Sequence, residues 1–174
     1  MALFNKSTTA GSTPAPARGH SPFDAIGGAE ARAGGVYPKA GIYPCLYVDA
    51  IKMIRSRKGE DVFVAEFDIL DSACAERPAG TRMSWACNFR HDASPGNVKA
   101  FLAAVMDVPA DEVDADGAQY ACGAENPCHG RLVRLEATDT TTKAGGPFTL
   151  CSWRALPQEL QDQAAAARTE AGFR

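Results

Sequence analysis

Five stretches of the chain have the hydrophobic content of β-strands, and in the first three of them hydrophobic residues recur at every second position, as in a strand with one buried face. The five stretches are residues 41–54, 61–71, 81–89, 131–139 and 148–156. The clearest is 61–71, whose apolar face carries Phe63, Ala65, Phe67 and Ile69. Its opposite face carries Val62, Val64, Glu66 and Asp68. We predict that the first face is buried and that the second points outward.

The first stretch, 41–54, changes phase near Asp49, after which Ile51 and Met53 take over the apolar positions. One extra residue in a strand exchanges its two faces, so this change predicts a β-bulge. On the N-terminal side of the bulge, Tyr43 and Tyr47 have the outward phase. The first two stretches together predict a hairpin that turns at residues 55–60.

The third stretch, 81–89, has an inward phase for Met83, Trp85, Cys87 and Phe89. Arg82 and Asn88 have the outward phase. The last two stretches predict a second hairpin, whose turn lies in "TTTKAGGP", residues 140–147, because its glycines supply the usual chemistry of a turn.

Between the third and fourth stretches the hydrophobic spacing becomes that of a helix. Its buried stripe is formed by Val98, Phe101, Leu102 and Val105. Ser94 suits the N-cap position and Pro95 suits the first helical position, so we predict a helix over 94–106. A polar insert with a short helix follows, and a last helix is predicted to start at Pro157.

Three strands, one helix and a final hairpin follow each other in the order typical of the OB-fold, a five-stranded and partly open barrel. We therefore predict a mainly β protein with an OB-type barrel at residues 36–156. Another five-stranded antiparallel barrel or sandwich would produce the same pattern. Residues 1–35, rich in Ser, Gly, Ala and Pro, are predicted to form a flexible tail and arm, and residues 157–174 a helical tail.

In an OB-fold, an oligonucleotide crosses the second and third strands between the loops of the two hairpins. Arg55, Arg57 and Lys58 would then lie on one loop and Lys143 on the other, with Arg82 and Asn88 on the floor between them. Bases stack on aromatic side chains in such sites. The candidates for stacking are Tyr43, Tyr47 and Trp153, although the strand of Trp153 is apolar on both faces.

The same residues also have a purely structural interpretation. Charged hairpin tips are common in solvent, and lysines at sheet edges prevent strands of different molecules from pairing. Glu66 and Asp68 would place negative charge on the predicted binding face, where they would repel phosphates.

Composition narrows the class of protein. The chain has 174 residues, of which 45% are hydrophobic and 22% charged, with a net charge of -3, so it does not coat nucleic acid with its whole surface. Five acidic residues lie within 107–116, and without that cluster the net charge is near +2. No signal sequence or membrane span is recognisable, so we expect a soluble, cytoplasmic protein.

Six cysteines are present, and their apolar surroundings favour reduced, buried thiols over disulfides. Cys122, Cys128 and His129 form a cluster, to which Cys74 could add a fourth ligand. Because the spacing differs from that of paired zinc cysteines, we predict no metal site and no cofactor. His91 and Asp92 lie beside Ser94, but no nucleophile elbow, phosphate-binding loop or dinucleotide motif is present. We therefore predict that the protein is not an enzyme.

Several short segments together resemble a family of small phage and prophage proteins found among replication and recombination genes. They are "YPKAGIY", "SRKGEDVFVAEFDIL", "MSWACN", "SPGNVKAFLAAV", "ENP" and "TTKAGGPFT". The resemblance as a whole covers roughly residues 23–154. Members are often described as single-stranded DNA-binding proteins. The resemblance implies this function, phage replication proteins as partners and the host cytoplasm as location, and it extends to Arg57, Lys58, Gly59 and Lys143.

Two hypotheses follow from the sequence. In the first, the protein binds single-stranded DNA in an OB-type groove during phage replication or recombination, without catalysis. In the second, it is a protein-interaction or virion-assembly module, in which the barrel is a scaffold and the tails make the contacts.

Overall fold

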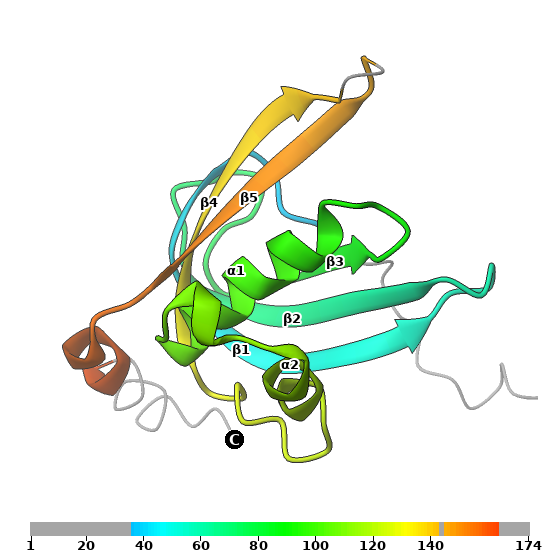
Figure 1. The fold of residues 1–174 in the computed structure, drawn as a ribbon. Coiled ribbons are helices and arrows are strands. Elements are labelled where there is room, and N and C mark those ends of the chain that lie inside the picture. The colour runs from blue at the N-terminus through cyan, green and yellow to red at the C-terminus, as the bar shows by residue number, and fades with distance from the viewer. Residues whose placement is uncertain (1–35, 143–144, 164–174) are drawn as a thin grey trace, which may run out of the picture. The chain divides into compact units, whose positions relative to one another are not determined.

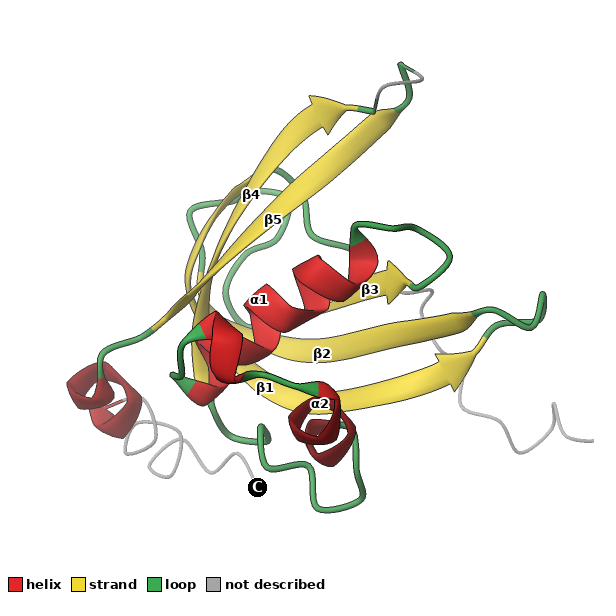
Figure 2. Ribbon diagram, in the orientation of Figure 1, coloured by secondary structure: helices red, strands yellow, loops and turns green. Residues whose placement is uncertain are grey.

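The structure, a computed structural model, describes residues 36–142 and 145–163. Its main feature is one antiparallel sheet of five strands in the order β3-β2-β1-β4-β5 (Figures 1 and 2). The strands are β1 (Gly41–Arg55), β2 (Asp61–Asp71), β3 (Arg82–Asn88), β4 (Leu132–Thr141) and β5 (Pro147–Ala155). The mainly β class is confirmed, and each strand lies within two residues of its predicted bounds. The sheet is open, because its outer strands β3 and β5 are not paired with each other.

Helix α1 (Ser94–Met106) packs against β3, β4 and β5 (Figure 1). Its predicted bounds are confirmed, and the predicted stripe from Val98 to Val105 is buried. The predicted N-cap is wrong: Ala93 occupies that position, and Ser94 is the first helical residue. The Ser94 hydroxyl instead donates to the carbonyl oxygen of Asn88 (2.6 Å), so it ties the helix to the end of β3.

The core is centred on Phe101 of α1, which has no exposed surface. Its ring contacts Phe63 and Phe67 of β2, Trp85 of β3 and Trp153 of β5, with centroid distances of 4.9 to 5.8 Å. The rings of Trp85 and Trp153 lie 5.2 Å apart. The inner side chains of the two outer strands therefore meet, although the strand backbones do not pair.

Strand β1 contains two irregularities where the sequence predicts one. The register with β2 shifts between Val48 and Ala50, which confirms the bulge at Asp49, and it shifts again between Cys45 and Leu46. The second shift turns Tyr43 and Leu46 to the same side, and both are fully buried. The predicted outward direction of Tyr43 is therefore wrong, because the phase changes once more than the hydrophobic pattern indicates.

The insert between α1 and β4 contains a short 3-10 helix, η2 (Ala110–Glu112), and α2 (Ala115–Ala121). The loop after α2 is fixed to the bulge of β1. His129 Nδ1 donates to the carbonyl oxygen of Asp49 (2.7 Å), and His129 Nε2 lies 3.3 Å from the hydroxyl of Tyr47. This loop, together with Leu132 and Leu156, covers the outer side of β1 at Tyr47, which is 9% exposed.

The residues that follow β5 begin a helix, as predicted from Pro157, and the described part of it is 158–163. Gln161 is buried there and donates to the carbonyl oxygen of Leu156 (3.0 Å). The predicted tail and arm at 1–35 and the rest of the C-terminal tail lie outside the described residues. In the part of the chain that is described, no helix is long and apolar enough to cross a membrane.

Candidate nucleic-acid interface

The tip of the β1–β2 hairpin carries three exposed cations, namely Arg55, Arg57 and Lys58. The turn is closed by a hydrogen bond from the Ser56 N–H to the Glu60 carbonyl oxygen (2.8 Å). Arg55 Nε also donates to the carbonyl oxygen of Gly59 (3.1 Å). Among the described residues, no carboxylate forms an ion pair with these three cations. Their charges are therefore available to an anion from outside.

The outer face of the sheet next to this tip is different, because its cations are paired. Lys52 lies 2.6 Å from Glu66, while Arg82 lies 2.8 Å from Asp49 and 2.7 Å from Asp68. The hydrogen bond and charge of Asp68 raise the pKa of Arg82. Arg82, predicted as part of a binding floor, is thus held by two carboxylates. The expected repulsion from Glu66 and Asp68 is likewise reduced, since each has a cation against it.

Asn88 lies at the base of the tip, and its amide is fully used. Its Nδ2 donates to Glu60 (2.8 Å), and its Oδ1 accepts from the backbone N–H of Arg90 (2.9 Å). The Arg90 guanidinium adds an ion pair with Glu60 (3.1 Å). The hydrogen bond from Asn88, followed by that from Arg90, lowers the pKa of Glu60. This network keeps the carboxylate of Glu60 engaged with Asn88 and Arg90.

The tyrosines predicted as stacking platforms are not accessible. Tyr43 lies in the main core, where its hydroxyl donates to the carbonyl oxygen of Lys39 (2.8 Å) and burial raises its pKa to about 12. Tyr47 is covered by His129, whose ring meets it edge to face at 5.6 Å. The predicted outward direction is wrong for Tyr43, while Tyr47 lies on the outer side of β1 but is covered there, so neither ring can serve as a stacking platform.

Trp153, whose direction the sequence left open, points inward and stacks on Phe67 at 5.4 Å. Its indole N–H is buried without an acceptor among the described residues. Lys143, predicted on the second loop, lies outside the described residues. Beside it, the turn is closed by a hydrogen bond from the Thr142 N–H to the Gly146 carbonyl oxygen (2.8 Å).

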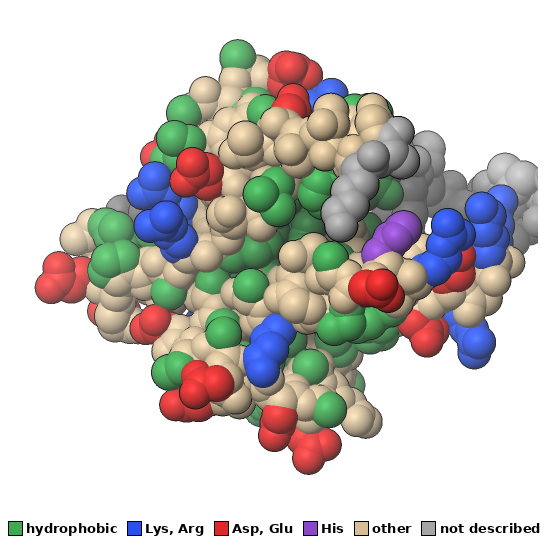
Figure 3. Space-filling view, turned by 45° about the horizontal axis from the view of Figure 1, so that its top comes forward, with side chains coloured by type: hydrophobic (Ala, Val, Ile, Leu, Met, Phe, Trp, Pro, Cys, Tyr) green, Lys and Arg blue, Asp and Glu red, His purple; other side chains and the backbone are tan. Residues whose placement is uncertain are grey.

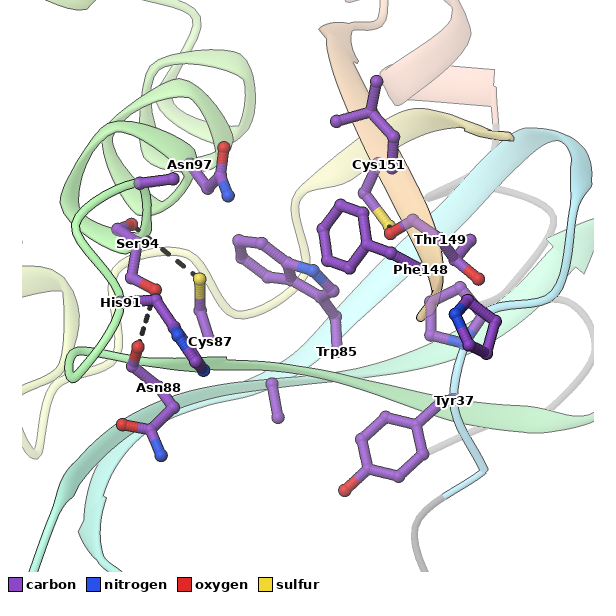
Figure 4. A pocket seen from close by; sticks show the side chains of 15 residues that line it. Tyr37, Trp85, Cys87, Asn88, His91, Ser94, Asn97, Phe148, Thr149 and Cys151 are labelled. Atoms are coloured by element: carbon purple, nitrogen blue, oxygen red, sulfur yellow. Dashed lines mark hydrogen bonds between the residues drawn. The ribbon is translucent and has the colours of Figure 1, made fainter. Parts of the chain in front are cut away.

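A cavity of about 360 Å³ lies in the open part of the sheet between β3 and β5 (Figure 4). Its walls are residues 85–88 of β3 and 147–151 of β5, and the first turn of α1 closes one end. Tyr37 and Pro38 stand at the other side of it. Among the described residues, no Asp, Glu, Lys or Arg lines this cavity. The hydrophobic pattern does not indicate the cavity, because it forms where two strands do not pair.

Figure 3 shows this part of the surface as a hollow with hydrophobic side chains, while Lys and Arg side chains gather over the β1–β2 tip. The tips of both hairpins project from the domain on the side where α1 begins (Figure 1). The cavity and the cations of the tip therefore lie on one side of this domain.

Other chemistry has little support among the described residues, where no group of three or more His, Cys, Asp or Glu residues is placed to hold a metal ion. Both ring nitrogens of His129 face partners within the protein. Burial raises the pKa of Cys128 to about 11 and also raises the pKa of Cys122, so neither thiol is activated as a nucleophile or a metal ligand.

The candidate interface thus consists of the cationic tip and the uncharged cavity. Comparison with known protein families finds no match, and comparison with curated proteins finds none either.

Proposed function

We propose that this protein binds single-stranded DNA, without a catalytic step of its own, on an open sheet of the OB type. The strand order β3-β2-β1-β4-β5 supports this fold, as does the position of α1 between the third and fourth strands. An OB barrel has the same neighbours and closes by bringing its third and fifth strands together. Here the rings of Trp85 and Trp153 make that contact between side chains.

The observation that carries the proposal is the contrast between paired and free cations. Lys52 and Arg82 each have a carboxylate partner on the sheet, and Arg90 has Glu60, which directly precedes β2. By contrast, the exposed cations of the tip at 55–58 have no such partner among the described residues. Phosphate contacts supply most of the affinity in non-specific binding of nucleic acid. A short cationic tip suits a single strand, which can bend to meet it.

The biological setting follows from the resemblance of the sequence to phage and prophage proteins. In that setting the protein acts in the cytoplasm of the host, with phage replication proteins as its partners. It protects or presents single-stranded DNA during replication or recombination. A chain that carries a net charge of -3 binds through a local basic site, so salt should weaken the complex strongly.

The test is a fluorescence anisotropy titration of the full chain with a labelled oligonucleotide at two salt concentrations. Wild type should bind at low salt, and replacing Arg57 and Lys58 by Glu should reduce the affinity at least tenfold. Loss of two phosphate contacts should also reduce the slope of log K against log salt by about 1.4. Absence of binding by wild type at low salt would refute the function.

A matched control is the double change Arg134→Glu and Arg154→Glu. These two exposed arginines lie opposite each other on β4 and β5, far along the ribbon from its turn. The control alters the net charge of the protein by the same amount, so it should change the affinity much less than the tip variant. An equal loss in both variants would mean that only the total charge matters.

The second candidate function is a protein-interaction or virion-assembly module. It is favoured by the outer half of the β4–β5 ribbon, where Phe148 and Leu150 are 45% and 46% exposed. A partner that remains bound after nuclease treatment, and is lost on deletion of residues 1–35, would support this function. A partner that disappears with nuclease would count against it.

A further inference from the structure

The cavity between β3 and β5 has aromatic side chains at its mouth. Tyr37 is 58% exposed and Phe148 is 45% exposed, while Trp85 forms part of the wall (Figure 4). Large rings that stay open to solvent beside an uncharged cavity are suited to stack on a planar ligand. Stacking of a base on an aromatic side chain contributes about 1–3 kcal/mol.

The backbone of β3 adds a hydrogen-bonding edge to this cavity. The Ser84 N–H donates to the carbonyl oxygen of Val36 (2.9 Å), and the Asn88 carbonyl oxygen accepts from His91 and Ser94. Both residues therefore direct their backbone groups away from β2. Because alternate residues of an antiparallel strand point the same way, Ala86 also directs its N–H and carbonyl oxygen toward the cavity that it lines. Neither group has a partner within the described part of the chain.

Some polar side chains of the cavity form hydrogen bonds within the protein, and others do not. Asn88 is bound to Glu60, and the Thr149 hydroxyl donates to Asp139 (3.1 Å). In contrast, the side chains of His91 and Asn97 form no hydrogen bond with any described residue. An imidazole and a carboxamide are therefore left to contact a ligand, near the end of the cavity that α1 closes.

These features fit a nucleobase better than a peptide strand. On β3 the free edge is interrupted on both sides of Ala86, because Val36 accepts from the Ser84 N–H and the loop before α1 donates to the Asn88 carbonyl oxygen. An added strand needs a ladder over several residues, whereas the edge of a base needs only one donor next to one acceptor. The lack of charge in the cavity suits the base, and the free cations of the nearby tip suit its phosphate.

We infer that the cavity between β3 and β5 holds one unpaired base of the bound strand, between the aromatic side chains at its mouth and the backbone of Ala86. This inference rests on the proposed function, because it assigns a base site to the strand that the cationic tip binds. It places the base in the gap of the sheet rather than on the outer face of β2, where charged residues pair with each other.

The experiment compares Tyr37→Ala and Phe148→Ala with the control Tyr120→Ala, in the full chain. Tyr120 is 53% exposed, similar to Tyr37, but it lies on α2 and does not line the cavity. The probe is a short oligonucleotide with one 2-aminopurine, whose fluorescence is quenched by stacking. Each cavity variant should weaken binding about 5- to 150-fold and reduce the quenching, while Tyr120→Ala should do neither.

A second measurement removes the base instead of the ring. An oligonucleotide with an abasic site at the bound position should bind wild type more weakly, and the Phe148→Ala change should then cause little further loss. Circular dichroism should show that all three variants are folded, because each altered side chain is exposed. The backbone amide of Ala86 should also shift in the NMR spectrum when the intact oligonucleotide is added.

The outcomes separate the two proposals. If wild type binds DNA and the tip variant does not, but the cavity variants retain full affinity and quenching, the base pocket is wrong and the function stands. If wild type binds no DNA at low salt, the function itself fails. If the cavity variants bind DNA normally but lose a nuclease-resistant protein partner, the cavity holds a peptide, and the base pocket is again wrong.

Discussion

The two hairpins of the sheet differ in what they present to solvent. Both expose two large apolar side chains near the tip: Met53 and Ile54 on β1, and Phe148 and Leu150 on β5. Only the β1–β2 tip also carries a run of free cations among the described residues. Only the β4–β5 hairpin places an exposed aromatic ring beside the cavity. One hairpin can therefore attract phosphates, and the other can contact bases.

The comparison extends to how each hairpin is supported. The β1–β2 hairpin pairs with β3 on one side and β4 on the other. The β4–β5 hairpin pairs only through β4, and its free edge at β5 is held by Trp153 against Phe67, Trp85 and Phe101. Besides the pairing of β4 with β1, one aromatic cluster thus positions the second hairpin relative to the first, and it is the first target for mutation.

Phe101→Ala should have the largest effect, because it removes the ring that contacts aromatic side chains of both hairpins. Phe101 is fully buried, and truncation of such a residue costs about 3–5 kcal/mol of unfolding free energy. Urea unfolding measured by tryptophan fluorescence would give this value. The control Phe89→Ala, at a position that is 38% exposed, should cost less than about 1 kcal/mol. Similar losses in both variants would mean that the cluster does not hold the hairpins together.

The buried side of the sheet was predicted from the sequence more accurately than the exposure of its tyrosines. Strict alternation over 61–71 and helical spacing over 94–106 determine which side chains can be buried, so β2 and α1 were placed correctly. The direction of Tyr43 was predicted wrongly because tyrosine occurs on both buried and exposed faces. The hydrophobic pattern therefore shows no break at the register shift between Cys45 and Leu46. Tyr47 was misassigned because its cover comes from residues far along the chain, including His129 and Leu156.

The candidate site was predicted only where it depends on local sequence. The position of the cations at 55–58 could be predicted because the turn itself is visible in the sequence, and in the structure they lie at an exposed tip. The pairing of Arg82 depends on the registers that bring Asp68 opposite it and Asp49 near it. The cavity depends on two outer strands that do not pair. Neither the ion pairs of Arg82 nor the cavity can be predicted from neighbouring residues in the sequence.

Gly59→Ala tests whether the first tip needs its particular turn. Gly59 has φ of 77° and no atom within 4 Å of an added Cβ, so the change meets no steric contact and its cost lies in the backbone alone. A left-handed conformation costs a non-glycine residue about 1–2 kcal/mol. Calorimetry should show this loss, while Gly96→Ala, in the first turns of α1, should be neutral or stabilise by up to about 1 kcal/mol. A stable Gly59→Ala protein would contradict the role assigned to the turn.

Arg82→Met and Arg57→Met test the difference between paired and free cations directly. Arg82→Met should cost about 1 kcal/mol of stability, because it removes the guanidinium that bridges Asp49 and Asp68, and it should leave the affinity for DNA nearly unchanged. Arg57→Met should change stability by less than about 0.5 kcal/mol and should weaken DNA binding. Denaturant titration and anisotropy, measured on both proteins, would reveal whether the two effects separate. A larger loss of affinity in Arg82→Met would move the binding face to the sheet.

The smallest expected effect concerns Glu60, a carboxylate in the loop of the first tip. Its pKa is lowered mainly by the hydrogen bond from Asn88 and then by that from Arg90. A carboxyl whose folded pKa is lowered stabilises the protein above the pKa of the unfolded chain, and this contribution is lost as the pH falls through the folded pKa. Asn88→Ala should therefore raise the Glu60 pKa toward its ordinary value and weaken the acid dependence of stability. NMR titration of the carboxyl carbon would measure the change, with Asn97→Ala as the control in the same cavity.

Asn88→Ala also tests whether the free cations that distinguish the β1–β2 tip depend on the hydrogen bonds of Glu60. Once released from Asn88, the ionised Glu60 can turn toward Lys58, whose charge already lowers its pKa. At neutral pH the freed carboxylate would then compete with phosphate for the tip, and DNA affinity should fall by about twofold. If the affinity of Asn88→Ala equals that of wild type while the Glu60 pKa rises, the carboxylate has no influence on the cations. The free charge of the tip would then come from the turn alone and would not need the network beneath it.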